Sequence, residues 1–477
     1  MHTGYDPFLR SLAPPPLLPT WNKRRPAEVV QQRVADIPGM VALPVRALMP
    51  ALPEPIWSPD AAFGPTDVEV IRQRTRDIVR TMDWSKIQRG KRVNLIANPH
   101  GFFLCGEAYV AMLEEIAAHV RATTGASVRL RIAESMGHIE NPDWMRIFDL
   151  RGRFGDAEEC PQIGKGTRVE TRLGDFWVTQ KLFHADHFIH THVTEMREGY
   201  LHRMLDRLYK PFGMGYTRLE TRSAYHFGFG PRTGQLVARA VFGSDFIQER
   251  YTGTVVLNTT SEGIVGVDGD NDLETLDKRL ATEILRNYGT LIRLLAEIDE
   301  CVTVFDGHGC AIYTYGGGIA FDNLLCANVD FLDLDNLALL AAFSPPEDMA
   351  RSGLLMGGNP AIKAIVINYM AGGVPEQFLW DQYPTLVVGE PVYRWLITDP
   401  SNTYLAERAT VIPDLATALD RARELTGTDK VIAFDRTPGA LRVSESMGHH
   451  LLARAPAVAA DVEQHRLPKW LAQRHLA

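Results

Sequence analysis

Short runs with strand character alternate with longer runs of helix character along most of this chain. The clearest case begins with Arg92–Ala97, a largely apolar run that stops at the turn Asn98–Gly101. A longer run from Glu107 to about Ala122 has apolar residues three or four places apart, and residues 127–135 are again strand-like. Strand, helix and strand in this order form a right-handed βαβ unit. The alternation therefore predicts an α/β protein.

Length and element order divide the chain into four expected parts. The 477 residues are enough for two or three domains that each bury a core. A long helix predicted from about Leu273 to Ile298 is of a length that suits a bridge between two lobes, with a ligand cleft between them. The expected parts are a proline-rich extended arm (1–65), a first α/β domain (66–270), a second α/β domain (271–440) and a C-terminal tail (441–477).

The remaining apolar runs predict further elements of both kinds. The predicted helices are Met196 to about Tyr209, Leu334–Phe343 and Asp414–Thr426. The predicted strands are Leu236–Val241, Thr254–Asn258, Lys363–Met370, Thr385–Gly389 and Lys430–Asp435.

Charge and composition exclude several classes of protein. Fifty basic residues against 58 acidic ones give a net charge of −8, which argues against binding to nucleic acid or to an anionic membrane. No run approaches the ~20 apolar residues of a membrane span, and the N-terminus lacks a secretory signal pattern. The five cysteines form no CxxC pair. We expect reduced, buried thiols in a cytoplasmic protein.

The first 65 residues are dense in proline, including the run Pro14-Pro15-Pro16. Proline fixes φ and removes a hydrogen-bond donor, so this stretch is expected to be extended. An arm of this kind packs either on its own protein or on a neighbouring subunit. A homo-oligomer joined through the arm is therefore one of two expectations.

Histidines gather in residues 166–200, where four of them fall between positions 184 and 192 (His184, His187, His190 and His192). The run HFIHTHV has strand character, and on a strand His190 and His192 point to the same face. Two imidazoles ~7 Å apart along one face can share a metal ion or a substrate. Equally, they can be buried side chains with hydrogen-bond partners and no further role. Both interpretations stay open.

A second group of polar residues follows the first two predicted strands. His100 lies in the turn after the first strand, and His138 follows the second. Parallel strands end at the same edge of a sheet, where α/β proteins bind ligands. His100 and His138 are thus expected at one edge, which is a second reason to expect a site.

Several segments resemble the nickel-pincer lactate racemase family. They are the strand–turn–helix–strand that ends at Met136-Gly137-His138, the stretch GTRVETRLGDFWVTQKLFHADHFIHTHVTE, the segment GGGIAFDNLL and the C-terminal unit ERATVIPDLATALDRARELTGTDKVIAFD. The likeness covers about residues 90–435. It implies a racemase or epimerase of a 2-hydroxy acid that carries a nickel-pincer nucleotide and acts on a small carboxylate substrate.

The resemblance also implies roles for individual residues. Lys181 would hold the nucleotide covalently, and His190 or His192 would ligate nickel. Asn98 lies in the turn that stands where the family has its nucleotide-anchoring turn. His138 would be the general base, with His100 as its partner, and Arg197 or Arg222 would pair with the substrate carboxylate.

Two alternatives belong to other classes. In the first, His190 and His192 bind a divalent metal that activates water in a hydrolase. In the second, the chain keeps the fold as a non-catalytic binding protein. A bound metal with a nucleotide-like chromophore is expected of the isomerase, a metal alone of the hydrolase and neither of the binding protein.

Overall fold

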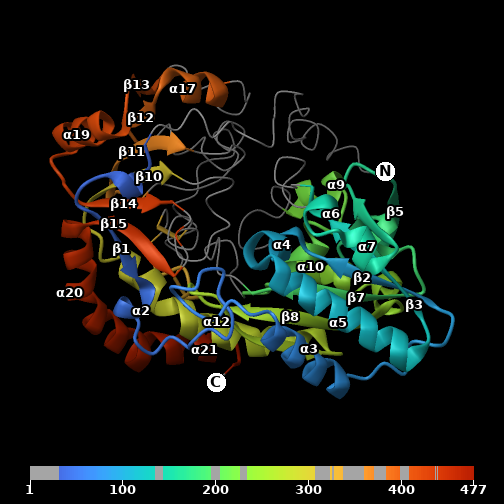
Figure 1. Ribbon diagram of the computed structural model, residues 1–477. Coiled ribbons are helices and arrows are strands. Elements are labelled where there is room, and N and C mark those ends of the chain that lie inside the picture. Colours follow the sequence, from blue (N-terminus) through green and yellow to red (C-terminus); the bar gives the residue numbers. More distant parts are fainter. Residues whose placement is uncertain are drawn as a thin grey trace. The chain divides into compact units, whose positions relative to one another are not determined.

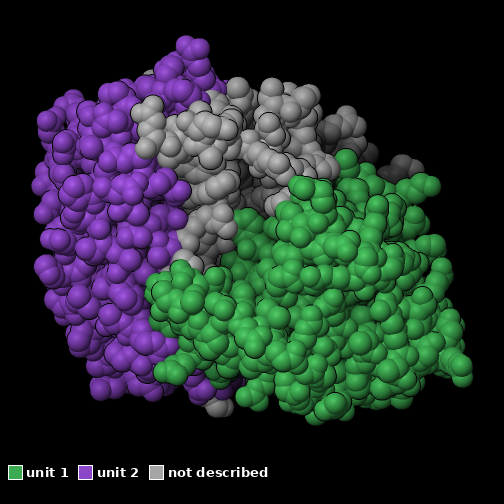
Figure 2. All heavy atoms as spheres, in the orientation of Figure 1, with its two compact units in different colours: residues 1–14, 54–195, 201–283 green, residues 15–53, 196–200, 284–477 purple. Residues whose placement is uncertain are grey.

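The computed structural model describes residues 32–134, 143–194, 205–225, 234–306, 323–324, 327–336, 359–369, 383–397, 408–435, 437 and 439–476. These residues form two compact units (Figure 2). Unit 1 contains the described residues from 54 to 283, and unit 2 contains those of 32–53 and of 284–476. Each unit has its own sheet, so the chain is a mixed α/β protein, as the alternating runs predicted.

The main sheet of unit 1 has the strand order β4-β3-β2-β7-β8-β9 in the described residues. The first five of these strands are parallel, and β9 is antiparallel to β8. The chain runs from β2 outward to β3 and β4, then returns to β7 on the other side of β2. The strands are β2 (Arg92–Ala97), β3 (Ser127–Ala133), β4 (Ala157–Cys160), β7 (His187–Val193), β8 (Tyr251–Thr259) and β9 (Ile264–Asp270).

Helices and a hairpin cover this sheet (Figure 1). On one face α5 lies beside α3, and α4 packs on β7. The hairpin is β5 (Gly166–Thr171) with β6 (Gly174–Thr179). The helices are α3 (Glu69–Thr81), α4 (Pro99–Cys105), α5 (Glu107–Thr124), α6 (Trp144–Ile147), α7 (Leu150–Phe154), α8 (Gln180–Phe183), a 3₁₀ turn at Lys210–Phe212, α9 (Leu219–Ser223), α10 (Gln235–Phe242) and α11 (Asp245–Gln248).

Unit 2 has the strand order β1-β15-β14-β10-β11-β12-β13 in its described residues. Strands β14, β10, β11, β12 and β13 are parallel, whereas β15 and β1 run antiparallel to their neighbours. The strands are β1 (Met40–Pro44), β10 (Cys301–Asp306), β11 (Ile362–Tyr369), β12 (Thr385–Val388), β13 (Thr410–Ile412), β14 (Val431–Phe434) and β15 (Ala440–Ser444).

Most residues after β15 belong to helices of unit 2. The helical elements of this unit are a 3₁₀ turn at Val34–Asp36, α2 (Val45–Leu48), α17 (Glu390–Ile397), α19 (Leu415–Thr426), α20 (Glu445–Asp461), a π-helical turn at Val462–Arg466 and α21 (Leu467–Gln473). The long helix α12 (Leu273–Leu295) contributes residues to both units. Within unit 2, Trp470 of α21 is fully buried against Gly289 of α12.

Several predicted elements are confirmed, and two are wrong. Leu236–Val241 was predicted as a strand, but Gln235–Phe242 is helix α10. Leu236 is 44% exposed while Val237, Ala238 and Val241 are buried, which is the burial pattern of a helix face. The predicted helix from Met196 does not reach Tyr209, because Leu205 has φ +69° and residues 207–209 form a turn. The rest of that helix, and residues 337–343 of the helix Leu334–Phe343, lie outside the described residues.

Two segments expected to be irregular contain regular elements. Residues 40–44, placed in the extended arm, form β1 at the edge of the unit 2 sheet. The expected tail contains most of β15, α20 and α21. Cys105, Cys160 and Cys301 are free and buried, as predicted for thiols of the core. In the part of the chain that the structure describes, no helix is both long and apolar enough to cross a bilayer.

Candidate functional site

Polar side chains lie at the carboxyl ends of three adjacent strands of the unit 1 sheet. Asn98 follows β2 and Glu134 follows β3, while His192 is near the end of β7. The β2–β7 register pairs Ile96 with His190, and Asn98 and His192 each lie two residues beyond this pair. With His100, these side chains form what we call the strand-end cluster. Each of its four residues is less than 10% exposed.

The position of this cluster is the one where α/β sheets bind ligands. The chain reverses its direction of strand addition between β2 and β7. A crevice opens outside the carboxyl ends of the two strands at such a switch point. The strand-end cluster is therefore the primary candidate site.

The turn that carries Asn98 is held by a chain of hydrogen bonds behind it. The Asn98 backbone N–H donates to the Tyr109 hydroxyl at 2.9 Å, which lies 2.6 Å from Thr191 Oγ1. Thr191 Oγ1 in turn donates to the Ile96 carbonyl at 2.8 Å. Burial raises the pKa of Tyr109, so its hydroxyl keeps its proton and donates to Thr191. The Asn98 side chain accepts from the His100 N–H at 2.9 Å and begins α4.

Gly101 allows the close approach on which this arrangement depends. A Cβ at Gly101 would lie 2.4 Å from ring atoms of Tyr109, well inside van der Waals contact. Only glycine therefore lets the turn and the Tyr109 ring occupy these positions.

Arg222, predicted to bind a substrate carboxylate, is linked to the strand-end cluster through Gln162. Arg222 of α9 donates from Nη1 to Gln162 Oε1 at 3.0 Å. The Gln162 backbone N–H donates to Glu134 Oε2 at 2.7 Å. Gln162 is 1% exposed, so this connection is buried. Glu134 and Gln162 were missed as site residues in the sequence, although Glu134 is the next-to-last residue of the predicted strand 127–135.

His190 and His192 share a face of β7, as predicted, with ring centroids 5.8 Å apart. His190 is fully buried, and its Nδ1 lies 2.7 Å from the Tyr216 hydroxyl. Burial lowers the pKa of His190 to about 3 and raises that of Tyr216 well above its ordinary value. Tyr216 therefore donates to a neutral imidazole, and the Nδ1 lone pair is already in use. This matches the interpretation of His190 as a buried residue with a hydrogen-bond partner.

The ammonium group of Lys181 pairs with a residue outside the strand-end cluster. Its side chain is 55% exposed and pairs with Glu158 of β4, and the hydrogen bond from Glu158 raises the pKa of Lys181. Strands β3 and β2 separate β4 from β7. Three strand spacings of ~4.8 Å place Glu158 about 14 Å from the histidines of β7. His138 and Arg197, the other two predicted site residues, lie outside the described residues.

Two residues that the resemblance assigns to the nickel nucleotide have other partners in the structure. The resemblance requires Lys181 and a nickel-ligating histidine to reach one group, but Lys181 pairs with Glu158 and His190 with Tyr216. Among the residues that the structure describes, no three histidine, cysteine, aspartate or glutamate side chains are placed to hold a metal ion. Among the described residues, the lysine that is buried is Lys210, which is 7% exposed. The sequence did not single out Lys210 as a candidate site residue. A bound cofactor stays a prediction.

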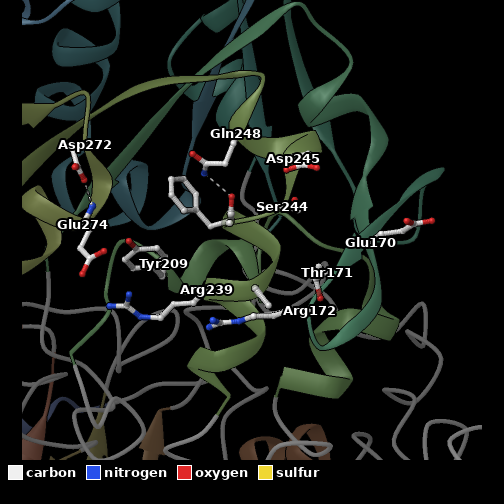
Figure 3. A pocket seen from close by; sticks show the side chains of 13 residues that line it. Glu170, Thr171, Arg172, Tyr209, Arg239, Ser244, Asp245, Gln248, Asp272 and Glu274 are labelled. Atoms are coloured by element: carbon white, nitrogen blue, oxygen red, sulfur yellow. Dashed lines mark hydrogen bonds between the residues drawn. The ribbon is translucent and has the colours of Figure 1, made fainter.

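A second polar hollow lies elsewhere in unit 1. This cavity of about 730 Å³ lies between the β5–β6 turn, α10, α11 and the start of α12 (Figure 3). Arg239 contributes to its wall, with its guanidinium 4.3 Å from the centre of the Tyr209 ring. Arg239 also pairs with buried Asp206, Nε lying 3.1 Å from Oδ1. Burial, and then the nearby charge of Asp206, raises the pKa of Asp277 of α12 to about 7.

Comparison with known proteins does not assign the chain to a family. No family model matches the chain, and no curated protein matches it. The likeness to the lactate racemase family therefore rests on the sequence segments alone.

Proposed function

We propose that the chain is an enzyme that binds a small carboxylate at the strand-end cluster and isomerises it, with 2-hydroxy acids as its substrate class. The observation that supports the proposal best is the placement of Glu134 and His192 at the ends of β3 and β7, with His100 in the first turn of the helix that follows β2 between them. Histidine is the side chain that most readily exchanges protons near neutral pH.

Each residue of the cluster has a role in this proposal. The imidazole of His100 or His192 accepts the hydroxyl proton of the substrate. Inversion at C2 also needs an acceptor for the C2 hydride, which is the chemistry that the predicted nickel nucleotide would supply when bound. Arg222, half-buried at the end of the Gln162 connection, pairs with the carboxylate through its planar guanidinium. Asn98 and Tyr109 hold the turn in place, and Glu134 positions Gln162. These residues supply the proton transfer and the binding.

The test uses single enantiomers of a panel of 2-hydroxy acids and chiral chromatography of the products. Wild-type protein purified from its own host should interconvert the enantiomers of at least one acid. His100→Gln should lower that rate about 10²–10⁴-fold, the usual contribution of a general acid–base group. His184→Gln is the matched control, because His184 is an exposed histidine of the same unit and its replacement should leave the rate unchanged.

Binding and metal content separate the alternatives. Calorimetric binding of an acid without interconversion would instead support a non-catalytic binding protein. Hydrolysis that depends on a divalent metal would support the hydrolase. Metal and mass analysis of the same preparation tests the predicted nickel nucleotide, and retention of that group by Lys181→Ala would contradict the role assigned to Lys181. If the protein neither binds nor converts any acid of the panel, the proposal fails.

A further inference from the structure

An arginine from the beginning of the described chain is bound at a strand end of unit 2. Asp306 is the last residue of β10, and its side chain is completely buried. Arg33 Nε lies 2.9 Å from Asp306 Oδ1, and Arg33 Nη2 donates to the Asp306 backbone carbonyl. The planar guanidinium thus contacts both the carboxylate and the main chain of one residue. Such a fork is specific for guanidinium and is not reproduced by an ammonium group.

Other contacts complete this arrangement. Asn368 of β11 donates from Nδ2 to Asp306 Oδ1 at 2.8 Å and to the Gln32 carbonyl at 2.8 Å. The Val34 N–H donates to Asp306 Oδ2 at 2.7 Å. Asp306 and Asn368 therefore bind the backbone of residues 32–34 as well as the Arg33 side chain. Val34 itself is fully buried in the core of the unit 2 sheet.

These contacts lie where the order of strand addition reverses in the unit 2 sheet. From β10 the chain adds β11, β12 and β13 on one side and then returns to add β14 on the other. The carboxyl end of β10, where Asp306 lies, is thus the switch point of unit 2, the usual ligand position in such a sheet. In this protein, residues 32–34 of the same chain lie at that position.

We infer that Asp306, oriented by Asn368, forms a binding site for a guanidinium group, and that Arg33 fills it and so fastens the N-terminal segment across the switch point of unit 2. The ligand class is that of guanidino compounds, with the arginine of the chain itself as the resident ligand. Removal of the Arg33 side chain leaves a buried carboxylate whose main cationic partner is gone. A small guanidinium ion can then replace it.

Chemical rescue of the full-length chain tests this inference. Arg33→Ala should lower the melting temperature by several degrees, because a buried carboxylate loses its partner. Millimolar ethylguanidinium should restore at least half of that loss, whereas ethylammonium, which lacks the planar fork, should restore much less. Limited proteolysis should report the same change, with faster cleavage of residues 32–53 in Arg33→Ala and protection by ethylguanidinium.

Two variants control the experiment. Arg46→Ala removes another arginine of the same segment. Its guanidinium donates to the carbonyls of Leu52 and Pro53, so ethylguanidinium should not rescue this variant. The double variant Arg33→Ala, Asp306→Asn should also resist rescue. If Arg33→Ala cannot be purified folded, its refolding yield with each of the two ions gives the same comparison. Absence of rescue, or equal rescue of Arg33→Ala and Arg46→Ala, overturns the inference.

Discussion

At the scale of single residues, buried ionisable groups shape the response of unit 1 to pH. Asp277 is 4% exposed, accepts from the Leu208 N–H at 3.0 Å and lies close to the charge of Asp206. Its pKa of about 7 is well above that of a carboxyl group in an unfolded chain. Between about pH 4 and pH 7 the folded protein therefore holds a proton that the unfolded chain has lost. The stability from this group is fully present below that window and decreases as pH rises to 7.

Replacement of Asp277 by asparagine tests this pH dependence. The variant keeps an oxygen for the Leu208 N–H but cannot ionise, so it should not lose stability as pH rises. We expect the free energy of unfolding of Asp277→Asn to exceed that of the wild type by roughly 1–3 kcal/mol at pH 8, and by much less at pH 5. Urea unfolding at pH 5 and at pH 8 measures this difference in the free energy of unfolding. Asp245→Asn, a change at an exposed acid on the cavity rim, should behave like the wild type. Parallel curves for wild type and Asp277→Asn would contradict the prediction.

At the scale of elements, the turn from β2 into α4 decides how the candidate site is built. Asn98 ends the strand side of the turn and begins the helix, and the ring of Tyr109 supports it from α5. Gly101 faces that ring with no space for a side chain. The geometry of the strand-end cluster thus depends on a contact between two helices that follow one another in the chain.

Gly101→Ala should damage this turn. The added Cβ must displace the Tyr109 ring, because an aromatic ring held by two hydrogen bonds has little freedom to move. We expect a loss of about 1–3 kcal/mol in the free energy of unfolding, the usual range for overpacking. Activity on the 2-hydroxy acid panel should fall with it. Gly266→Ala is the control, because a Cβ there meets no atom within 4 Å. Similar melting temperatures for the two variants would show that the turn adapts.

At the scale of the whole molecule, the two units have separate cores. The core of unit 1 includes Leu182 and the aromatic residues around His190, whereas that of unit 2 includes Leu386 and the apolar side chains of β10 and β11. Each unit is therefore expected to have its own free energy of unfolding.

Paired core substitutions test this independence. Leu182→Ala and Leu386→Ala each remove a nearly fully buried side chain and should cost about 2–5 kcal/mol. Hydrogen exchange should show the loss mainly in the strands of unit 1 for Leu182→Ala and mainly in those of unit 2 for Leu386→Ala. Equal loss of protection in both units from either variant would show that the whole chain unfolds as one cooperative body.

The amino-acid sequence by itself determined the local elements whose periodic pattern is strong. It predicted β2, α5, β3 and β7, and it predicted that His190 and His192 share a face, because the direction of a side chain on a strand depends only on position along it. The run Leu236–Val241 was misread because a run of only six residues, five of them apolar, fits both a strand and a helix.

The tertiary structure alone decided which of the predicted site residues meet. Strand order depends on packing between segments far apart in the chain, so no local pattern could show that β3 and β2 separate Glu158, the partner of Lys181, from the histidines of β7. The same long-range packing joins Arg222 to Glu134 through Gln162 and brings Arg33 to Asp306. Contacts of this kind arise when the core is assembled, because burial leaves each polar group dependent on whichever partner the fold places beside it.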